Sequence, residues 1–457
     1  MHSKVESGAT HGADSHHARV LTRAGRNVGW LAGSTGFSAV ASLLYVALTA
    51  RTLGPRGFGD FALIMTYAEL IGALVQFQVW RAVGSFGAKH QLAGNKARLG
   101  RLFGYSTSLE FGSGLVGSFL GFAGVLLIGP LLHWTRAEEY AAAWFGAAML
   151  MTSGTAPAGM LRLFNRFDLQ AYTEAVGQFA RFVGCLSGWA FGAGLAWFLC
   201  VWPLAALLEL ILQWAAVLAL GHRLTFGYRA LRLARHENRG LWPFILKTSI
   251  SSTLGLLCVQ CGTLVVGMRA GPIEAGGFRL AYRFSQAMTK PVEIATKALL
   301  PELAHLVAGG NELATRRVLI WVTWISAAFA SLVVLAAGLA GREILRLIAG
   351  PRFEFASGFL VLLCIAAAIN VAGFALEPFH NAHFRQGTVL RANVVAACLY
   401  GALLAILLPV FGAVAAAIAS IAAAVAIIVQ LGISTLQILN REAKDARGSR
   451  TRLPESR

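Results

Sequence analysis

The residues of this chain best placed to do chemistry are charged and amide side chains on one helix face between positions 276 and 300. They follow one another at intervals of three or four: Arg279, Arg283, Gln286, Lys290, Glu293 and Lys297. At about 100° per residue, this spacing places all of them within an arc of about 80°. Arginine can bind phosphate through two parallel hydrogen bonds and lysine adds a mobile positive charge, so these residues could bind a phosphate-bearing anion.

These six residues, the cationic stripe, extend about 27 Å, close to the thickness of a hydrocarbon core. A cation at mid-bilayer costs about 2.5–3.5 kcal/mol even on insertion scales, so the stripe cannot face lipid. It could line a wet cavity that accepts an anion, pair with acids such as Glu69 and Glu110 in a structural network, or belong to a helix on the membrane surface. We favour the cavity, because ionisable groups inside a membrane usually mark function.

The elements that must position the stripe are membrane-spanning helices. Of the 457 residues, 56% are hydrophobic and 13% are charged, with a mean hydropathy of +0.63, whereas soluble domains carry about 25% charged residues. Irregular chain cannot cross a bilayer, so we expect an all-α integral membrane protein with about twelve transmembrane helices. The segments of spanning length are 28–50, 58–80, 103–132, 140–161, 170–191, 195–221, 243–268, 275–300, 316–340, 355–378, 385–409 and 411–436.

The placement of lysine and arginine predicts how these helices are oriented. Of the 39 basic residues, 26 lie in loops and tails on the side of the two termini, seven lie in loops on the other side, and six lie within spans. Because cytoplasmic loops are rich in Lys and Arg, both termini should be cytoplasmic. Topology thus accounts for the net charge of +18. We expect the basic interval 222–241 to contact anionic membrane lipids and not nucleic acid.

The chain repeats itself at an offset of 217 residues. Gly54-Pro55, Gly59, Phe61 and Leu63 recur as Gly271-Pro272, Gly276, Phe278 and Leu280. Six spans is an even number, so the two halves should share one orientation, related by a pseudo-two-fold axis along the membrane normal. The expected units are a disordered cytoplasmic tail at 1–27, a six-helix lobe at 28–221, a basic cytoplasmic linker at 222–241, a second six-helix lobe at 242–436 and a basic cytoplasmic tail at 437–457. Two such lobes can rock about a central cavity.

The repeat also predicts what faces the stripe. Subtracting 217 from its positions gives one face of the span 58–80, which carries Glu69 and Gln76. Both spans should therefore present polar faces to one cavity. The expected substrate-binding residues are Arg279, Arg283, Gln286, Lys290, Lys297, Tyr282 and Gln76, and the expected coupling residues are Glu69 and Glu293. In the empty cavity Glu69 would pair with Arg283 or Lys290 and be released to bind a proton when substrate arrives; the alternative is that it only balances their charge.

No metal or cofactor site is expected. Cys258 and Cys261, and the series Glu377, His380 and His383, have spacings that metal sites use, but the first pair lies within a span and a proline interrupts the second. No phosphate-binding loop or nucleophile motif occurs, and no connection is longer than about 20 residues. With so little room for a catalytic domain, we expect a transporter and not an enzyme.

The stretch ARTLGPRGFGDFAL, from Ala50 to Leu63, resembles the signature of Wzx-type polysaccharide transporters. The second Gly-Pro, at 271–272, and the Phe-Gly-Ala turn at 411–413 are similar to that family too, and the resemblance covers residues 25–440. It implies the multidrug/oligosaccharidyl-lipid/polysaccharide exporter fold and the flipping of polyprenyl-pyrophosphate-linked oligosaccharides across a bacterial inner membrane. It also implies basic residues in the central cavity, which Arg279, Arg283 and Lys290 match. The fourteen-span lipid II flippases are similar as well, but the twelve spans make a peptidoglycan precursor the less expected substrate.

The expected function is therefore flipping of a lipid-linked oligosaccharide by alternating access, for O-antigen, exopolysaccharide or capsule synthesis. The expected partners are this substrate and anionic membrane lipids, with polysaccharide polymerase and chain-length machinery as further candidates. One alternative is an exporter of drugs or other amphiphiles with the same fold, which would need an acid-dominated cavity. Another is a membrane glycosyltransferase or ligase, which would need a large loop carrying acids or histidines.

The charge asymmetry makes a testable topology prediction. Reporters fused at Glu138 and Glu274 should read as periplasmic, and reporters fused at Arg98 and Arg232 should read as cytoplasmic, because basic loops stay inside. Paired alkaline phosphatase and fluorescent-protein fusions would measure this. A cytoplasmic signal at Glu274 would contradict the predicted span at 275–300, and with it the predicted cavity.

Overall fold

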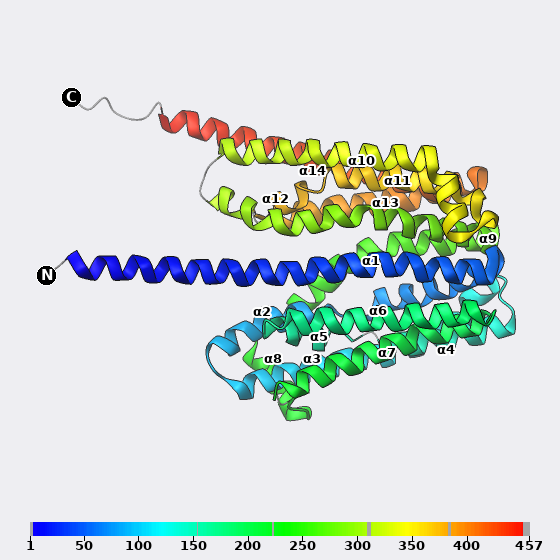
Figure 1. The fold of residues 1–457 in the computed structure, drawn as a ribbon, viewed down its shortest axis with the longest axis horizontal. Helices are drawn as coiled ribbons and strands as arrows, with labels where there is room; N and C mark the ends of the chain where they lie inside the picture. The colour runs from blue at the N-terminus through cyan, green and yellow to red at the C-terminus, as the bar shows by residue number, and fades with distance from the viewer. Residues whose placement is uncertain (1–2, 153, 222–223, 309–311, 383–384, 451–457) are drawn as a thin grey trace.

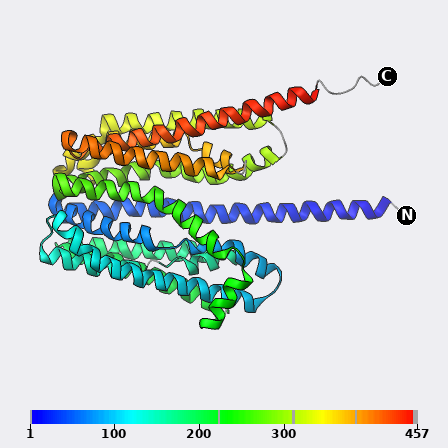
Figure 2. The same cartoon turned by 180° about the vertical axis from the view of Figure 1, so that it is seen from behind.

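The computed structural model describes residues 3–152, 154–221, 224–308, 312–382 and 385–450, and nearly all of this chain is helical. Long helices lie side by side, and α1 begins at the same end of the bundle at which α14 ends (Figures 1 and 2). The all-α fold predicted from hydropathy is confirmed. Some side chains within these helices lie outside the description, including those of 3–28 and 291–316, so the expected disorder of 1–27 stays a prediction.

The helices follow one another without any strand in the described chain. The first half contains α1 (Ser3–Val75), α2 (Val79–Leu92), α3 (Lys96–Leu131), α4 (Arg136–Thr152), α5 (Ala156–Leu163), α6 (Phe167–Ala190) and α7 (Leu195–Ala219). A short helix, α8 (Tyr228–Glu237), connects the halves. The second half contains α9 (Leu241–Ala308), α10 (Glu312–Ala349), the 3₁₀ helix η1 (Pro351–Ala356), α11 (Ser357–Ala372), α12 (Leu376–Ala382), α13 (Gln386–Phe411) and α14 (Val414–Arg450).

Two glycines turn the longest helices back on themselves at the end of the bundle opposite the start of α1 (Figure 2). We call this the kinked end. Gly54 in α1 has φ 67° and ψ −179°, and Gly271 in α9 has φ 84° and ψ 175°. Glycine adopts positive φ readily, and the proline that follows each one cannot donate a helical hydrogen bond. The two turns share sequence and backbone geometry, which confirms the repeat here and shows that α1 and α9 each hold two predicted spans.

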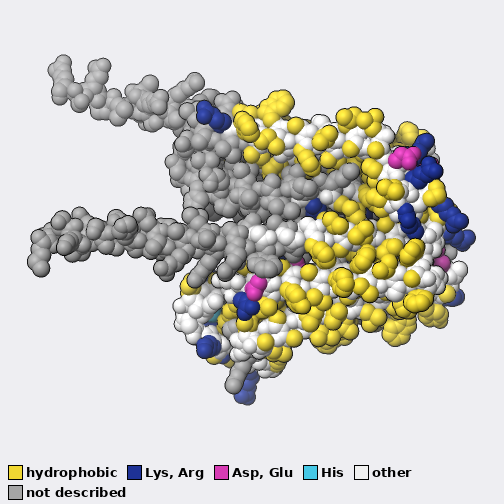
Figure 3. Space-filling view, in the orientation of Figure 1, with side chains coloured by type: hydrophobic (Ala, Val, Ile, Leu, Met, Phe, Trp, Pro, Cys, Tyr) yellow, Lys and Arg dark blue, Asp and Glu magenta, His cyan; other side chains and the backbone are white. Residues whose placement is uncertain are grey.

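Seven helical stretches of the described chain are long and apolar enough to cross a membrane. The other predicted spans correspond to helices that are kinked, broken or polar: α4 and α5 are separated by a break, and α6 carries Glu174 and Arg181. On the face drawn in Figure 3, hydrophobic side chains cover much of the described surface, and Lys and Arg gather at the kinked end. This apolar surface is what a multi-pass membrane protein presents to lipid.

The connection between the halves is a helix docked on the first half. Glu237, at the end of α8, accepts hydrogen bonds from Nη2 and Nε of Arg101 on α3, at 2.5 and 3.0 Å. Buried Asn238 is hydrogen-bonded through Oδ1 to Nε2 of His90 at 2.8 Å. These contacts hold α8 against α2 and α3 and leave Arg229 and Arg232 exposed.

The two halves contact each other at equivalent positions of the repeat. Gly59 and Gly276 are equivalent positions of the repeat, and a Cβ placed on Gly276 would lie 2.8 Å from Cα of Gly59. A Cβ on Gly59 would overlap the carbonyl group of Pro272. A side chain at either position would therefore force the two backbones apart. Because equivalent residues touch each other only near the axis that relates them, the pseudo-two-fold axis passes beside this glycine pair.

This packing predicts the effect of one added methyl group. Gly59→Ala should destabilise the protein by about 1–3 kcal/mol, since the new methyl group forces two backbones apart. The midpoint of thermal unfolding in detergent would measure this. Gly84→Ala in α2 is the matched control, because a Cβ there meets no atom within 4 Å. Equal midpoints for the two variants would contradict the close approach of the halves.

Candidate functional site

A cavity of about 430 Å³ lies between the two halves. Its walls come from α1 beyond Gly54, from α4, and from both arms of α9. The polar residues that line it are Glu69, Gln76, Gln78, Thr253, Gln260, Arg279, Tyr282, Arg283, Gln286 and Lys290. The two repeat-related spans therefore do present polar faces to one cavity, as the sequence predicted.

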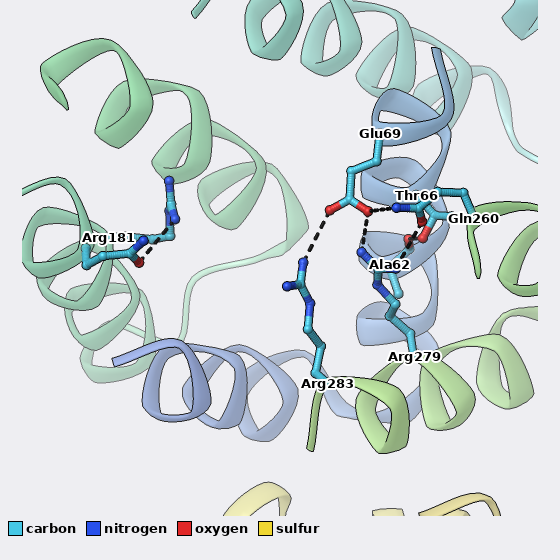
Figure 4. A network of polar contacts seen from close by, with 8 residues as sticks. Ala62, Thr66, Glu69, Arg181, Gln260, Arg279 and Arg283 are labelled. Atoms are coloured by element: carbon cyan, nitrogen blue, oxygen red, sulfur yellow. Dashed lines mark hydrogen bonds and ion pairs between the residues drawn. The ribbon is translucent and has the colours of Figure 1, made fainter. Parts of the chain in front are cut away.

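Glu69 is the centre of a hydrogen-bond network that joins the halves (Figure 4). Its Oε2 accepts from Nη2 of Arg279 and from Nε2 of Gln260, the latter at 2.7 Å. Arg279 also donates from Nη1 to Oε1 of Gln260 at 3.0 Å. On the other side, Arg283 donates to Oε1 of Glu69 at 3.3 Å. One carboxylate thus contacts two cations, one much more closely than the other.

The network gives the two arginines different environments. Arg279 is 4% exposed, and a buried guanidinium is tolerated only when a countercharge and further hydrogen bonds compensate it. Glu69 and Gln260 provide both. The side chain of Arg283 is 40% exposed and faces the cavity, so its contact with Glu69 is weaker. The predicted pairing of Glu69 with Arg283 is observed, but its closer partner is Arg279, which lies nearer to the contact between the halves.

The rest of the predicted site lies around this network. Tyr282, Gln286, Lys290 and Gln76 line the cavity. The side chains of Glu293 and Lys297 lie outside the described residues, so their roles stay predictions.

Glu110 does not join the stripe, and that part of the structural-network alternative is wrong. Its carboxylate, on α3, accepts hydrogen bonds from the backbone N–H groups of Thr155 and Ala156 at 2.7 and 2.9 Å, and from Oγ1 of Thr155. The first N–H groups of α5 have no partner within their own helix. Glu110 satisfies them and so stabilises the break between α4 and α5.

Two polar residues inside spans were missed by sequence reasoning. Gln260 is an amide within an apolar run of α9, and that isolation was the signal that could have identified it. Glu209 is an acid within apolar α7, where it accepts a hydrogen bond from Gln213 at 3.2 Å and packs against Gly177 of α6. Arg181 of α6, set apart from the Glu69 network in Figure 4, lies 5.6 Å from the ring centres of Tyr45 and Trp202.

Comparison with known proteins finds a matching family and a related membrane protein. The family described as polysaccharide biosynthesis protein matches residues 24–307. Inner membrane protein YghQ of Escherichia coli (strain K12) is 28% identical over 333 residues, which is 72% of this chain and 93% of that protein.

Solved structures of other membrane proteins align with this chain at low sequence identity. An inward-facing multidrug resistance MATE family transporter of the MOP superfamily aligns with a TM-score of 0.65 and 13% identity, over 91% of this chain and 95% of that one. The lipid II flippase MurJ in its inward closed conformation aligns with a TM-score of 0.64 and 13% identity, over 93% of each chain. At such identities the likeness shows the fold alone, and it agrees with the two-lobe membrane fold predicted from the sequence.

The unequal burial of the two arginines predicts unequal effects on stability. Glu69→Ala leaves Arg279 buried without a countercharge and should cost about 3–5 kcal/mol. Arg283→Ala removes a partly exposed partner and should change stability by about 1 kcal/mol or less. Unfolding midpoints of the purified variants in detergent test this difference. An equal loss of stability in both variants would show that Glu69 does not specifically compensate the buried charge of Arg279.

Proposed function

Because the chain belongs to the polysaccharide biosynthesis protein family, we propose that it flips a polyprenyl-pyrophosphate-linked oligosaccharide from the cytoplasmic to the periplasmic leaflet of a bacterial inner membrane. One observation carries this proposal: the described lining of the central cavity contains three cations and one acid, and that acid is held by the most buried of the cations. With three cations against one acid, the described lining of the cavity carries a net positive charge. Such a lining favours an anionic substrate.

A pyrophosphate headgroup suits this arrangement. Arg283 can meet phosphate oxygens with two parallel N–H groups, and Lys290, two turns further along α9, adds a second charge. Tyr282, Gln286 and Gln76 offer hydrogen bonds to phosphate or sugar oxygens, and Lys297 continues the same helix face. The polyprenyl tail stays in lipid while the polar headgroup passes through the cavity. Arg279 contributes indirectly, by holding Glu69.

Transport follows from rocking of the two halves about this cavity. In this proposal the contact between Gly59 and Gly276 closes the kinked end, which is the predicted periplasmic side. A potential of 100 mV, negative inside, favours outward movement of each negative charge by about 2.3 kcal/mol. Binding of the headgroup to Arg283 also weakens the attraction between α1 and α9.

The acid is the proposed coupling residue. Substrate competes with Glu69 for Arg283, and separation of the halves would then free Glu69 from Arg279 and let it bind a proton; Glu293 on the same face is the second candidate. Glu69→Gln keeps the shape but cannot titrate, so transport by this variant in proteoliposomes should lose its dependence on a proton gradient. An unchanged dependence would leave Glu69 with a purely structural role.

The proposal also includes two kinds of partner, namely anionic lipids and the machinery of polysaccharide synthesis. Exposed Arg229 and Arg232 of α8 would bind anionic lipids at the cytoplasmic surface. Surface polysaccharide synthesis would place the polymerase and chain-length machinery downstream of the flipped substrate. An exporter of cationic drugs is disfavoured, because it would need a cavity dominated by acids.

The proposal predicts which substitutions abolish transport. Arg283→Ala or Lys290→Ala should prevent complementation of a flippase-null strain at normal protein abundance, because each removes a charge that stabilises the headgroup. Arg283→Lys should be partly active, since it keeps the charge and loses the planar fork. Arg136→Ala, an exposed arginine outside the cavity, is the control. Full complementation by the double Ala variant would contradict the anion cavity.

A further inference from the structure

Arginines are concentrated at the kinked end, which the predicted topology places on the side of the membrane where basic residues are disfavoured. Five of the seven basic residues that the sequence places in loops on this side lie in just two loops: Arg51, Arg56, Arg342, Arg346 and Arg352. Loops on the non-cytoplasmic side are generally poor in Lys and Arg. Figure 3 shows Lys and Arg side chains gathered at this end of the surface. Such a departure from the general pattern calls for a chemical reason.

Three of these arginines line one pocket of about 440 Å³, which we call the seam pocket because its two walls come from different halves. One wall is the turn of α1, with Arg51 and Gly54. The other is the end of α10 and the start of η1, with Arg346 and Arg352, and Phe353 adds apolar surface. The described lining of the pocket includes no acid.

Arg51 links the two walls of the seam pocket. Its Nε donates to the carbonyl of Ile348 at 2.8 Å, and its Nη2 donates to the carbonyl of Leu347. These carbonyls belong to the last turn of α10, where helix carbonyls lack partners and the helix dipole attracts cations. The contact joins the first half to the second, so it must break when the halves separate at this end.

The other two arginines are only lightly compensated. Arg346 lies 3.7 Å from Glu354 and 4.0 Å from Glu343, and exposed ion pairs of this kind contribute little. Arg352 is exposed, and its Nη1 lies 3.7 Å from where a Cβ on Gly54 would be. Two guanidinium groups therefore remain able to bind an anion beside the turn of α1.

We propose that the seam pocket binds the phosphate of a lipid headgroup at the exit end of the protein. Guanidinium groups on both walls can grip phosphate oxygens bidentately, and the apolar surface suits the start of a lipid chain. When the halves separate, phosphate oxygens replace the carbonyls at Arg51. Both the lipid-linked pyrophosphate and ordinary phospholipid offer this chemistry. The assignment to the exit end rests on the proposed function, while the binding chemistry does not.

Binding to the purified full-length protein tests the seam pocket. Affinities for farnesyl pyrophosphate and for dioleoyl phosphatidylglycerol would be measured in detergent by native mass spectrometry, with farnesol as the uncharged reference. All proteins carry Arg283→Gln and Lys290→Gln, so that the central cavity contributes little. Adding Arg346→Gln and Arg352→Gln should lower the affinity for at least one phosphate probe about tenfold, because each removes a charge-assisted hydrogen bond.

The matched control adds Arg136→Gln and Arg269→Gln, two exposed arginines at the same end outside the pocket. A loss confined to farnesyl pyrophosphate would identify the delivered substrate as the ligand. A loss confined to phosphatidylglycerol would identify bilayer phospholipid, and a loss of both would indicate general recognition of lipid phosphate. Affinities equal to those of the control for both probes would overturn the proposal. Because the readout is binding, that failure is distinct from a failure of the central-cavity variants to lose transport.

Discussion

The structure depends on the neutralisation of one buried cation. Arg279 lies inside a membrane protein at 4% exposure, and such a charge needs a partner. The partner comes from the other half of the chain, since Glu69 lies on α1 and Arg279 on α9. The pair therefore fixes the distance between the halves. It also neutralises Glu69, the acid in the described lining of the cavity. The described lining of the cavity, with three cations and one acid, keeps a net positive charge.

Symmetry in the backbone is combined with asymmetry in the side chains. The turns at Gly54 and Gly271 have the same geometry, and the pair Gly59 and Gly276 marks the axis that relates the two halves. At the equivalent positions on the cavity faces the residues differ: Arg279 corresponds to Ala62 and Glu69 corresponds to Gln286. The duplicated scaffold thus provides two similar halves, and the divergence of their side chains gives the described lining of the cavity a net positive charge.

Local sequence patterns predicted much of the fold and of the candidate site. The remaining contacts depend on long-range geometry. Helical spacing placed Arg283 and Lys290 on one face, because that effect acts within a few residues, and the recurring Gly-Pro pairs identified the repeat. The choice of Arg279 as the closer partner of Glu69 could not be derived in this way, since it depends on how near α1 approaches α9. Gln260 completes that pair from the first arm of α9, and Glu110 is drawn away by the free N–H groups of α5. Such preferences appear only when distant segments are placed in space.

The most direct test of the account is the preference of the purified protein for a charged headgroup. Equilibrium binding of undecaprenyl pyrophosphate and of undecaprenol would be compared in nanodiscs of neutral phosphatidylcholine, for the native protein and for the Arg283→Gln, Lys290→Gln variant. The account predicts that the pyrophosphate binds at least about tenfold more tightly than the alcohol, and that the variant loses most of this preference. Equal affinity of the native protein for both lipids would contradict a cavity built to accept an anion.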